Sequence, residues 1–256
     1  MRSIWKGAIS FGLVNIPVKL YSATQQSNVS LDMVDKKDHA RIRYIRVNEE
    51  TGKEVPWEQI GKAYKLEGDY IVLEDDDFEK AAPEKSKIIE VNNFVNEKEI
   101  DTIYFENSYY VEPEKSGVKA YALLREALHK SGKVGVAQFV LRTAATLTVL
   151  KPKGDVLVLS KLRFAEEIRP TDELIVPPKS EVKAAELKIA LTLIDQYSTE
   201  FDIAAFKDEY AASLKKVIEA KASGKEPKVK KLKITASKSQ DLMEQLKASL
   251  NKKKAG

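Results

Sequence analysis

Seven short apolar runs, separated by residues that favour turns, lie between residues 12 and 162 and restrict the possible folds more than any other feature of the chain. Such runs predict β-strands, and short strands joined by Gly, Pro, Asp and Asn turns are typical of an antiparallel barrel or sandwich. The predicted strands span residues 12–21, 41–47, 68–73, 86–94, 134–142, 145–151 and 155–162.

The first of these runs shows the strand pattern most clearly. Every second residue from Val14 to Leu20 is aliphatic, so these side chains share one face of a strand. Because Pro17 has no N–H to donate, we expect the strand at or near a sheet edge. Polar residues, Gly and Pro interrupt the stretch too often for a secretory leader. No stretch of the chain supplies the roughly 20 apolar residues of a membrane-spanning helix, so we expect a soluble protein.

Helices are predicted at one place inside the β-region and again after it. The stretch VKAYALLREALHKSG, residues 118–132, places Tyr121, Leu124 and Leu128 on one helix face, with Gly132 as its stop. Two prolines at 177 and 178 end the strand pattern, and amphipathic helices are predicted at about 181–198 and 203–222. Residues from 225 onward are too polar and charged to pack, which predicts a disordered segment. A short amphipathic helix is predicted within it at 240–250.

Composition bounds the chemistry of the chain. It has no cysteine and only two histidines, His39 and His129, so a disulfide framework, a thiolate zinc site and a metal site built on imidazole are not expected. Residues 221–256 hold 11 lysines against three carboxylates, a net charge of +8. Since the whole chain carries +4, the first 220 residues carry −4. A basic tail on a mildly acidic body indicates contact with a polyanion, or alternatively a solubilising tail.

Two further basic stretches lie inside the body. Residues 36–46, KKDHARIRYIR, hold five Lys and Arg residues, and alternation would place Arg41 and Arg43 on one strand face. Residues 130–169 carry eight cations against three carboxylates, with Lys151 and Lys153 at a predicted turn. Cations of this kind predict contact with DNA phosphates independently of base sequence, the alternative being charges scattered over solvated faces.

No catalytic arrangement emerges. Asp75, Asp76 and Asp77 are adjacent, so on a strand they would point to opposite faces, and a solvated turn explains them better than a metal-dependent nuclease site. The ETGKE stretch, residues 50–54, lacks the first glycine and the Ser/Thr of a phosphate-binding loop and predicts a hairpin turn.

Five sequence blocks carry a resemblance to a known family: WKGAISFGLVNIPVKLYSAT, RIRYIRVNEETGKEVPWEQI, KAYALLREAL, GKVGVAQFVLR and FDIAAFKDEYAASLKKVIEAKASGK. Over about residues 2–224 they closely resemble the bacterial Ku family of non-homologous end joining. The resemblance implies a homodimeric ring around a DNA end, without a cofactor and without enzymatic activity. One departure is that some family members have a Cys-x-x-Cys pair where this chain has Asn48 and Thr51, which excludes zinc there.

The fold class implied is mainly β with helices (α+β). Residues 1–178 would form a Ku-type antiparallel β-barrel with a bridging arm at about 40–75, residues 179–224 a helical segment that recruits the ligase, and residues 225–256 a flexible lysine-rich tail. A body of about 175 residues has a radius of gyration of about 16 Å, too small to enclose a duplex alone.

The function implied is sequence-independent binding of double-stranded DNA ends and recruitment of the multifunctional ATP-dependent DNA ligase (ligase D), in the cytoplasm at the nucleoid. The alternative is a general duplex-coating architectural protein. Expected DNA contacts are Lys36, Arg41, Arg43, Arg46, Lys133, Arg142, Lys151 and Lys153, with Lys228, Lys230, Lys231, Lys233, Lys252, Lys253 and Lys254 in the tail. Expected ligase contacts are Phe206, Tyr210 and Leu214, and no metal ligand is expected.

Overall fold

The computed structural model describes residues 1–26, 29–81, 87–141, 144–178 and 182–225, together with Met243, Gln245, Leu246 and Ser249. These residues belong to two compact units. The first contains Met1–Gln26 and Asp32–Pro170, and the second contains the described residues of 27–31 and 171–256.

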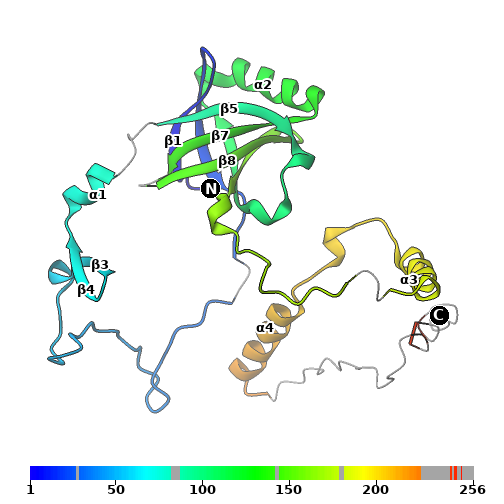
Figure 1. The fold of residues 1–256 in the computed structure, drawn as a ribbon. Helices are drawn as coiled ribbons and strands as arrows, with labels where there is room; N and C mark the ends of the chain where they lie inside the picture. Colours follow the sequence, from blue (N-terminus) through cyan, green and yellow to red (C-terminus); the bar gives the residue numbers. More distant parts are fainter. Residues whose placement is uncertain are drawn as a thin grey trace. The chain divides into compact units, whose positions relative to one another are not determined.

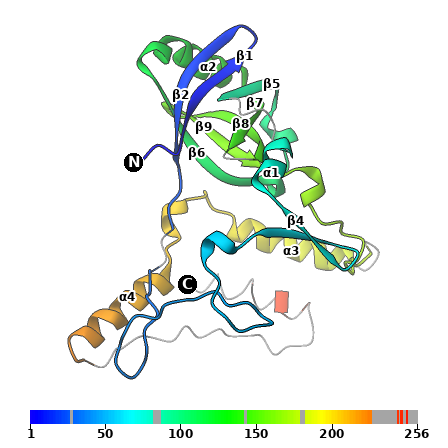
Figure 2. The same ribbon diagram turned by 90° about the vertical axis from the view of Figure 1, so that its left-hand side faces the viewer.

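A closed seven-stranded barrel is the centre of the first unit (Figures 1 and 2). Its strands neighbour one another in the order β1, β2, β6, β9, β8, β7, β5, and all pairs are antiparallel except β1 with β5, which is parallel and closes the barrel. The strands are β1 (Trp5–Phe11), β2 (Val14–Ser22), β5 (Ile88–Asn96), β6 (Phe105–Pro113), β7 (Lys133–Leu141), β8 (Ala144–Lys153) and β9 (Val156–Leu162).

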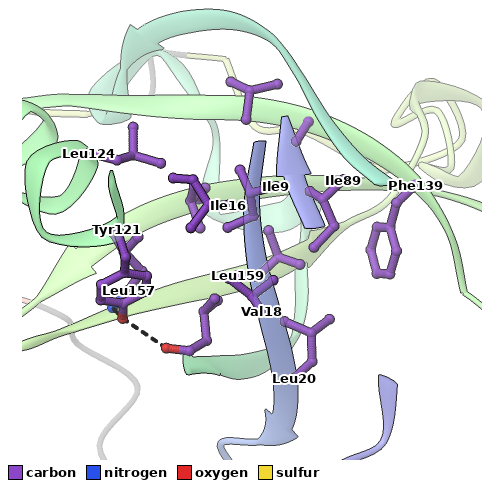
Figure 3. Packing of buried hydrophobic residues seen from close by; sticks show 14 of the residues in the cluster. Ile9, Ile16, Val18, Leu20, Ile89, Tyr121, Leu124, Phe139, Leu157 and Leu159 are labelled. Carbon is purple, nitrogen blue, oxygen red and sulfur yellow. Dashed lines mark hydrogen bonds between the residues drawn. The ribbon is translucent and has the colours of Figure 1, made fainter. Parts of the chain in front are cut away.

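The barrel interior is filled mainly by aliphatic side chains (Figure 3). Ile9, Ile16, Leu20, Leu157 and Leu159 are fully buried there. Helix α2 (Val118–Ser131) packs against β2, β7 and β8. As its periodicity predicts, its Tyr121, Leu124 and Leu128 are buried in the same cluster, and the helix ends at Gly132 with a φ of 64°.

A smaller apolar cluster lies on the other face of the β7, β8 and β9 sheet. Val134, Val149 and Leu162 form its buried centre, and Phe105 and Tyr104 pack against it. The chain between β5 and β6 supplies part of this layer through two short 3₁₀ turns, η2 (Glu97–Glu99) and η3 (Thr102–Tyr104). Strands β7 to β9 are therefore covered on both faces around Val134, Val149 and Leu162.

Six of the seven predicted strands are present, with ends shifted by a few residues: they are β2, β4 (Asp69–Leu73), β5, β7, β8 and β9. The prediction for residues 41–47 is wrong, because this stretch makes only isolated bridges, Val34 with Arg41 and Val47 with Glu54. The expected edge position of Pro17 is also wrong. Strand β2 has neighbours on both sides, and Pro17 is tolerated because the ladder with β6 begins only at Val18.

The segment of residues 32–81, called the arm below, has little regular structure. It holds the 3₁₀ turn η1 (Trp57–Gln59), a two-stranded sheet of β3 (Lys62–Leu66) and β4, and the short helix α1 (Asp75–Ala81). The predicted turn at 50–54 is present: Asn48 Oδ1 accepts the N–H groups of Glu50 and Thr51. Asp75, Asp76 and Asp77 begin α1 instead of forming a turn, and all three are exposed.

The second unit contains the two predicted helices, α3 (Ala184–Tyr197) and α4 (Glu209–Ala222). The 3₁₀ turn η7 (Ile203–Ala205) lies between them, and the turn η5 (Ala165–Glu167) belongs to the first unit. Helix α4 begins later than predicted because Asp208 is its N-cap and accepts the N–H of Ala211. None of the described residues of α3 or α4 is buried, although their periodicity predicts apolar faces. Of residues 240–250, the four that are described are helical.

Candidate nucleic-acid interface

A cavity of 510 Å³ on the outer face of the barrel brings together two of the predicted DNA contacts. Lys151 and Lys153 lie in the last three residues of strand β8, where alternate side chains leave the core. Leu150 is fully buried, and the side chain of the next residue points away from the core. Ser108 and Tyr110 of β6 and Val158 and Ser160 of β9 complete the cavity with Thr24, Glu97 and Phe105. The Ser108 and Ser160 hydroxyls are 3.0 Å apart. The cavity therefore offers two ammonium groups and several uncharged hydroxyls.

The two lysines differ in their surroundings. The Lys151 Nζ lies 2.5 Å from Glu97 Oε1 and 5.8 Å from the centre of the Phe105 ring. The Lys153 side chain is exposed and makes no ion pair with any described residue. Lys153 also borders a second cavity of 870 Å³ lined by Tyr110, Tyr121 and Arg125. Among the described residues, Lys153 is thus the cation of this cavity without an anionic partner, whereas Lys151 already has one.

Lys133 is not brought to the same place. It begins β7 and lines a different, largely apolar cavity of 540 Å³ with Phe11, Phe94 and Leu123. Its ammonium makes no ion pair within the described part of the chain. Lys133 therefore lies apart from the cavity of Lys151 and Lys153, and its contact with DNA stays a prediction. Arg142 and the seven tail lysines lie outside the described residues.

Two cations that the site prediction left out, Lys161 and Arg163, are held by one carboxylate. Glu106 Oε2 lies 2.7 Å from Lys161 Nζ, and Glu106 Oε1 lies 3.0 Å from Arg163 Nη2. The hydrogen bond from Lys161 and the two positive charges hold the pKa of Glu106 below its ordinary value, while the same hydrogen bond raises the pKa of Lys161. Because Glu106 lies 55 residues or more before its partners, no local pattern reveals this contact.

The predicted contacts in the arm are exposed. Arg41 Nη2 lies 3.4 Å from Asp32 Oδ1, and the guanidinium of Arg46 lies 4.5 Å from the centre of the Trp57 ring. Lys36 and Arg43 are exposed as well. The expected common face of Arg41 and Arg43 is absent, because the strand that would create it is absent.

The arm has no core of its own. None of its residues is buried, and many of its large apolar side chains are at least 39% exposed. These side chains are Met33, Val34, Ile42, Tyr44, Ile45, Val47, Trp57, Ile60, Tyr64, Leu66, Tyr70, Ile71, Val72 and Phe78. A surface of this kind marks an interaction site, since soluble monomers rarely expose such large apolar patches.

The predicted ligase contacts lie around the start of α4. Phe206 and Tyr210 are 71% and 74% exposed, and Leu214 is half-buried. Phe206 stacks on Phe201, with ring centres 6.1 Å apart. Phe201 is not among the residues that the sequence predicts as contacts, although it lies only five residues before Phe206. The turn η7 lies between the two rings in the chain.

No helix among the described residues is long and apolar enough to cross a membrane. Within the same residues, no group of three or more His, Asp and Glu side chains is placed to hold a metal ion.

Comparison with known proteins identifies the family. A family model described as "Ku70/Ku80 beta-barrel domain" matches residues 10–189. The chain is 40% identical to the "Non-homologous end joining protein Ku" of Coxiella burnetii, over 98% of this chain and 95% of that protein. Proteins with the same name are 39% identical in Bacillus subtilis, over 90% of this chain and 75% of the relative, and 38% identical in Archaeoglobus fulgidus, over 98% of each. With its closed barrel and a family match over most of its length, the chain belongs to the Ku family.

Proposed function

We propose that the protein binds the ends of double-stranded DNA independently of sequence, as a homodimeric ring, and serves end joining on chromosomal DNA in the cytoplasm. The relatives reported above are named for non-homologous end joining. The proposed activity is binding and not catalysis: the cations on the barrel suit phosphate contact, which carries no base preference.

The coreless arm is the observation that carries this proposal. A chain segment stays folded in water only if it buries enough apolar surface to offset its conformational entropy. The described arm residues bury none of their side chains fully, yet they expose aromatic and aliphatic groups from Met33 to Phe78. A second copy of the chain would supply the missing apolar layer, and the two arms would then close a ring that a duplex enters only from an end.

The second unit suits recruitment of a partner. Phe206, stacked on Phe201, and Tyr210 present aromatic rings to solvent, and aromatic side chains are enriched among residues that dominate binding energies. We assign this surface to the ATP-dependent multifunctional ligase of the pathway (ligase D). Removal of residues 225–256 is expected to leave end binding intact and to weaken bridging contacts made by the tail.

A gel-shift comparison of one DNA sequence in linear and covalently closed circular form tests the ring. The protein should shift the linear duplex and leave the circle nearly unshifted. Cutting both strands of the circle should restore binding, because this creates duplex ends. Equal affinity for the two forms would contradict the ring and favour a general duplex-coating protein. Sedimentation of the free protein provides the second measurement, because a monomer at the concentrations that bind DNA would also refute the proposal.

A further inference from the structure

The carboxylate of Glu97 occupies the cationic centre of the outer barrel cavity. Glu97 begins the turn η2 and reaches the end of β8, 54 residues later, where its Oε1 contacts Lys151 Nζ. The carboxylate, Lys151 and Lys153 all line the same 510 Å³ cavity. The Glu97 carboxylate is therefore an anion already bound beside the ammonium groups of this cavity.

A carboxylate and a DNA phosphate offer an ammonium group the same contact: a charged oxygen that accepts a short hydrogen bond. We propose that Glu97 holds the position of one backbone phosphate in this cavity and that bound DNA displaces it from Lys151. The inference rests on the proposed DNA binding and adds a residue that lowers the affinity of this site. Lys153, which has no ion-pair partner among the described residues, would make the neighbouring phosphate contact without such competition.

The surroundings of Glu97 suit displacement. Its side chain is 48% exposed and pairs with one cation, and no side chain caps the turn from which it projects. Glu106 forms the contrasting case: it is 20% exposed and binds both Lys161 and Arg163. Exposed single ion pairs are weak, so a phosphate that gains further contacts from the ring can replace one. Glu106 acts instead as a fixed link between strands β6 and β9.

The chain provides a matched control two residues away. Glu99 lies in the same turn and accepts a hydrogen bond from Asn96 Nδ2 at 2.6 Å, and it forms no ion pair with a cation of the described residues. Glu97→Gln and Glu99→Gln therefore change the net charge equally, but only the first frees Lys151. Lys151→Met and the double variant Glu97→Gln/Lys151→Met complete the set.

The experiment measures the dissociation constant of each variant for a fluorescent linear duplex by anisotropy at several salt concentrations. Glu97→Gln should bind about two- to five-fold more tightly than the parent, the range that an exposed ion pair represents. Its slope of log K against log salt should steepen by up to about 0.9, because one more phosphate is neutralised fully. Glu99→Gln should change the affinity less, and Lys151→Met should remove the gain from Glu97→Gln.

Two results would overturn the inference while DNA binding itself stands: equal gains from Glu97→Gln and Glu99→Gln, or a gain from Glu97→Gln that survives in the Lys151→Met background. If the parent protein does not bind the linear duplex, the proposed function fails as well, so the two failures are distinguishable. Thermal unfolding of each variant confirms that it is folded at the temperature of the binding measurement.

Discussion

Replacement of Tyr121 by phenylalanine removes the one hydroxyl that connects helix α2 to two barrel strands. Tyr121 Oη donates to the Val111 carbonyl oxygen at 2.8 Å and accepts the Leu157 N–H at 2.6 Å (Figure 3). Val111 and Leu157 are paired in the β6–β9 ladder, and their exposed fractions are 2% and 0%. Burial raises the pKa of Tyr121 above its ordinary value of 10.0, so the hydroxyl keeps its proton at neutral pH.

The substitution leaves one buried N–H and one buried carbonyl without this partner. Each buried polar group that loses its hydrogen bond costs about 1–3 kcal/mol, so the loss at both groups should lower the free energy of unfolding of Tyr121→Phe by about 2–6 kcal/mol. Tyr21→Phe is the matched control, because Tyr21 donates its hydroxyl to Glu112 at the surface, and a loss below about 1 kcal/mol is expected.

Urea unfolding followed by tryptophan fluorescence measures both variants. The chain has two tryptophans, so the measurement is made in a Trp57→Phe background, where Trp5 alone reports. Trp5 packs edge-on against Phe139, with ring centres 5.3 Å apart, and so reports on the barrel. If Tyr121→Phe costs no more than Tyr21→Phe at an unchanged m value, the bridging role assigned to the Tyr121 hydroxyl is refuted.

Three further changes test other parts of the barrel and the site. Glu106→Gln should cost roughly 1 kcal/mol at pH 7 and reduce acid sensitivity. The folded pKa of Glu106 is lowered, so its stabilisation is complete above its ordinary value of 4.5 and is lost as pH falls through the folded pKa. Unfolding curves from pH 7 to pH 3 should therefore converge with those of the parent at the acid end. Gly7→Ala should cost about 1–3 kcal/mol in urea unfolding, because a Cβ there would overlap the Lys87 carbonyl oxygen and the Trp5 ring, whereas Gly61→Ala meets only Val72 at 3.4 Å and should be nearly neutral. Lys153→Met should weaken binding to every linear duplex equally and reduce the salt slope by about 0.9, and unchanged salt dependence would remove Lys153 from the interface.

The sequence predicts the barrel best where one strand face enters the core. Strand β2 is predicted because Ile16, Val18 and Leu20 stand at every second position, and all three are fully buried. Strand β1 was missed, since small residues break the apolar pattern of WKGAISF. Strand β6, FENSYYVEP, was missed because it carries acidic and amide side chains on the outside of the barrel and ends in proline.

The arm shows why alternation of apolar and polar residues is not sufficient to predict a strand. Residues 41–44 alternate between arginine and apolar side chains as a barrel strand does, but a strand also needs a neighbour to pair with and a layer to cover it. Among the described residues the stretch has neither, and Ile42, Tyr44 and Ile45 remain exposed. In the proposed dimer a second chain would cover these side chains, and the alternation pattern of a single sequence is the same for a surface covered in this way and for a buried strand.

In the candidate site, the sequence predicts the cations but not the residues that pair with them. The sequence predicts Lys151 and Lys153 at a turn, whereas the structure places both in β8, with the turn to β9 directly after Lys153. The partners of the barrel cations come from distant positions: Glu97 for Lys151, and Glu106 for Lys161 and Arg163. Charge counts along the chain therefore overstate the number of free cations, because pairing is decided by the strand order of the closed barrel.

Paired cations also suit the proposed ring on physical grounds. A protein held on DNA by closure around the duplex needs no strong individual phosphate contact, and strong contacts would oppose movement inward from the end. Each free lysine that neutralises a phosphate adds to the salt-dependent affinity, while a lysine that must first leave a carboxylate adds less. A ring with a few free cations such as Lys153, and others such as Lys151 moderated by Glu97, would remain on the duplex through its closure and still move along it. The salt slopes of the Glu97 and Lys153 variants measure these two kinds of contact separately.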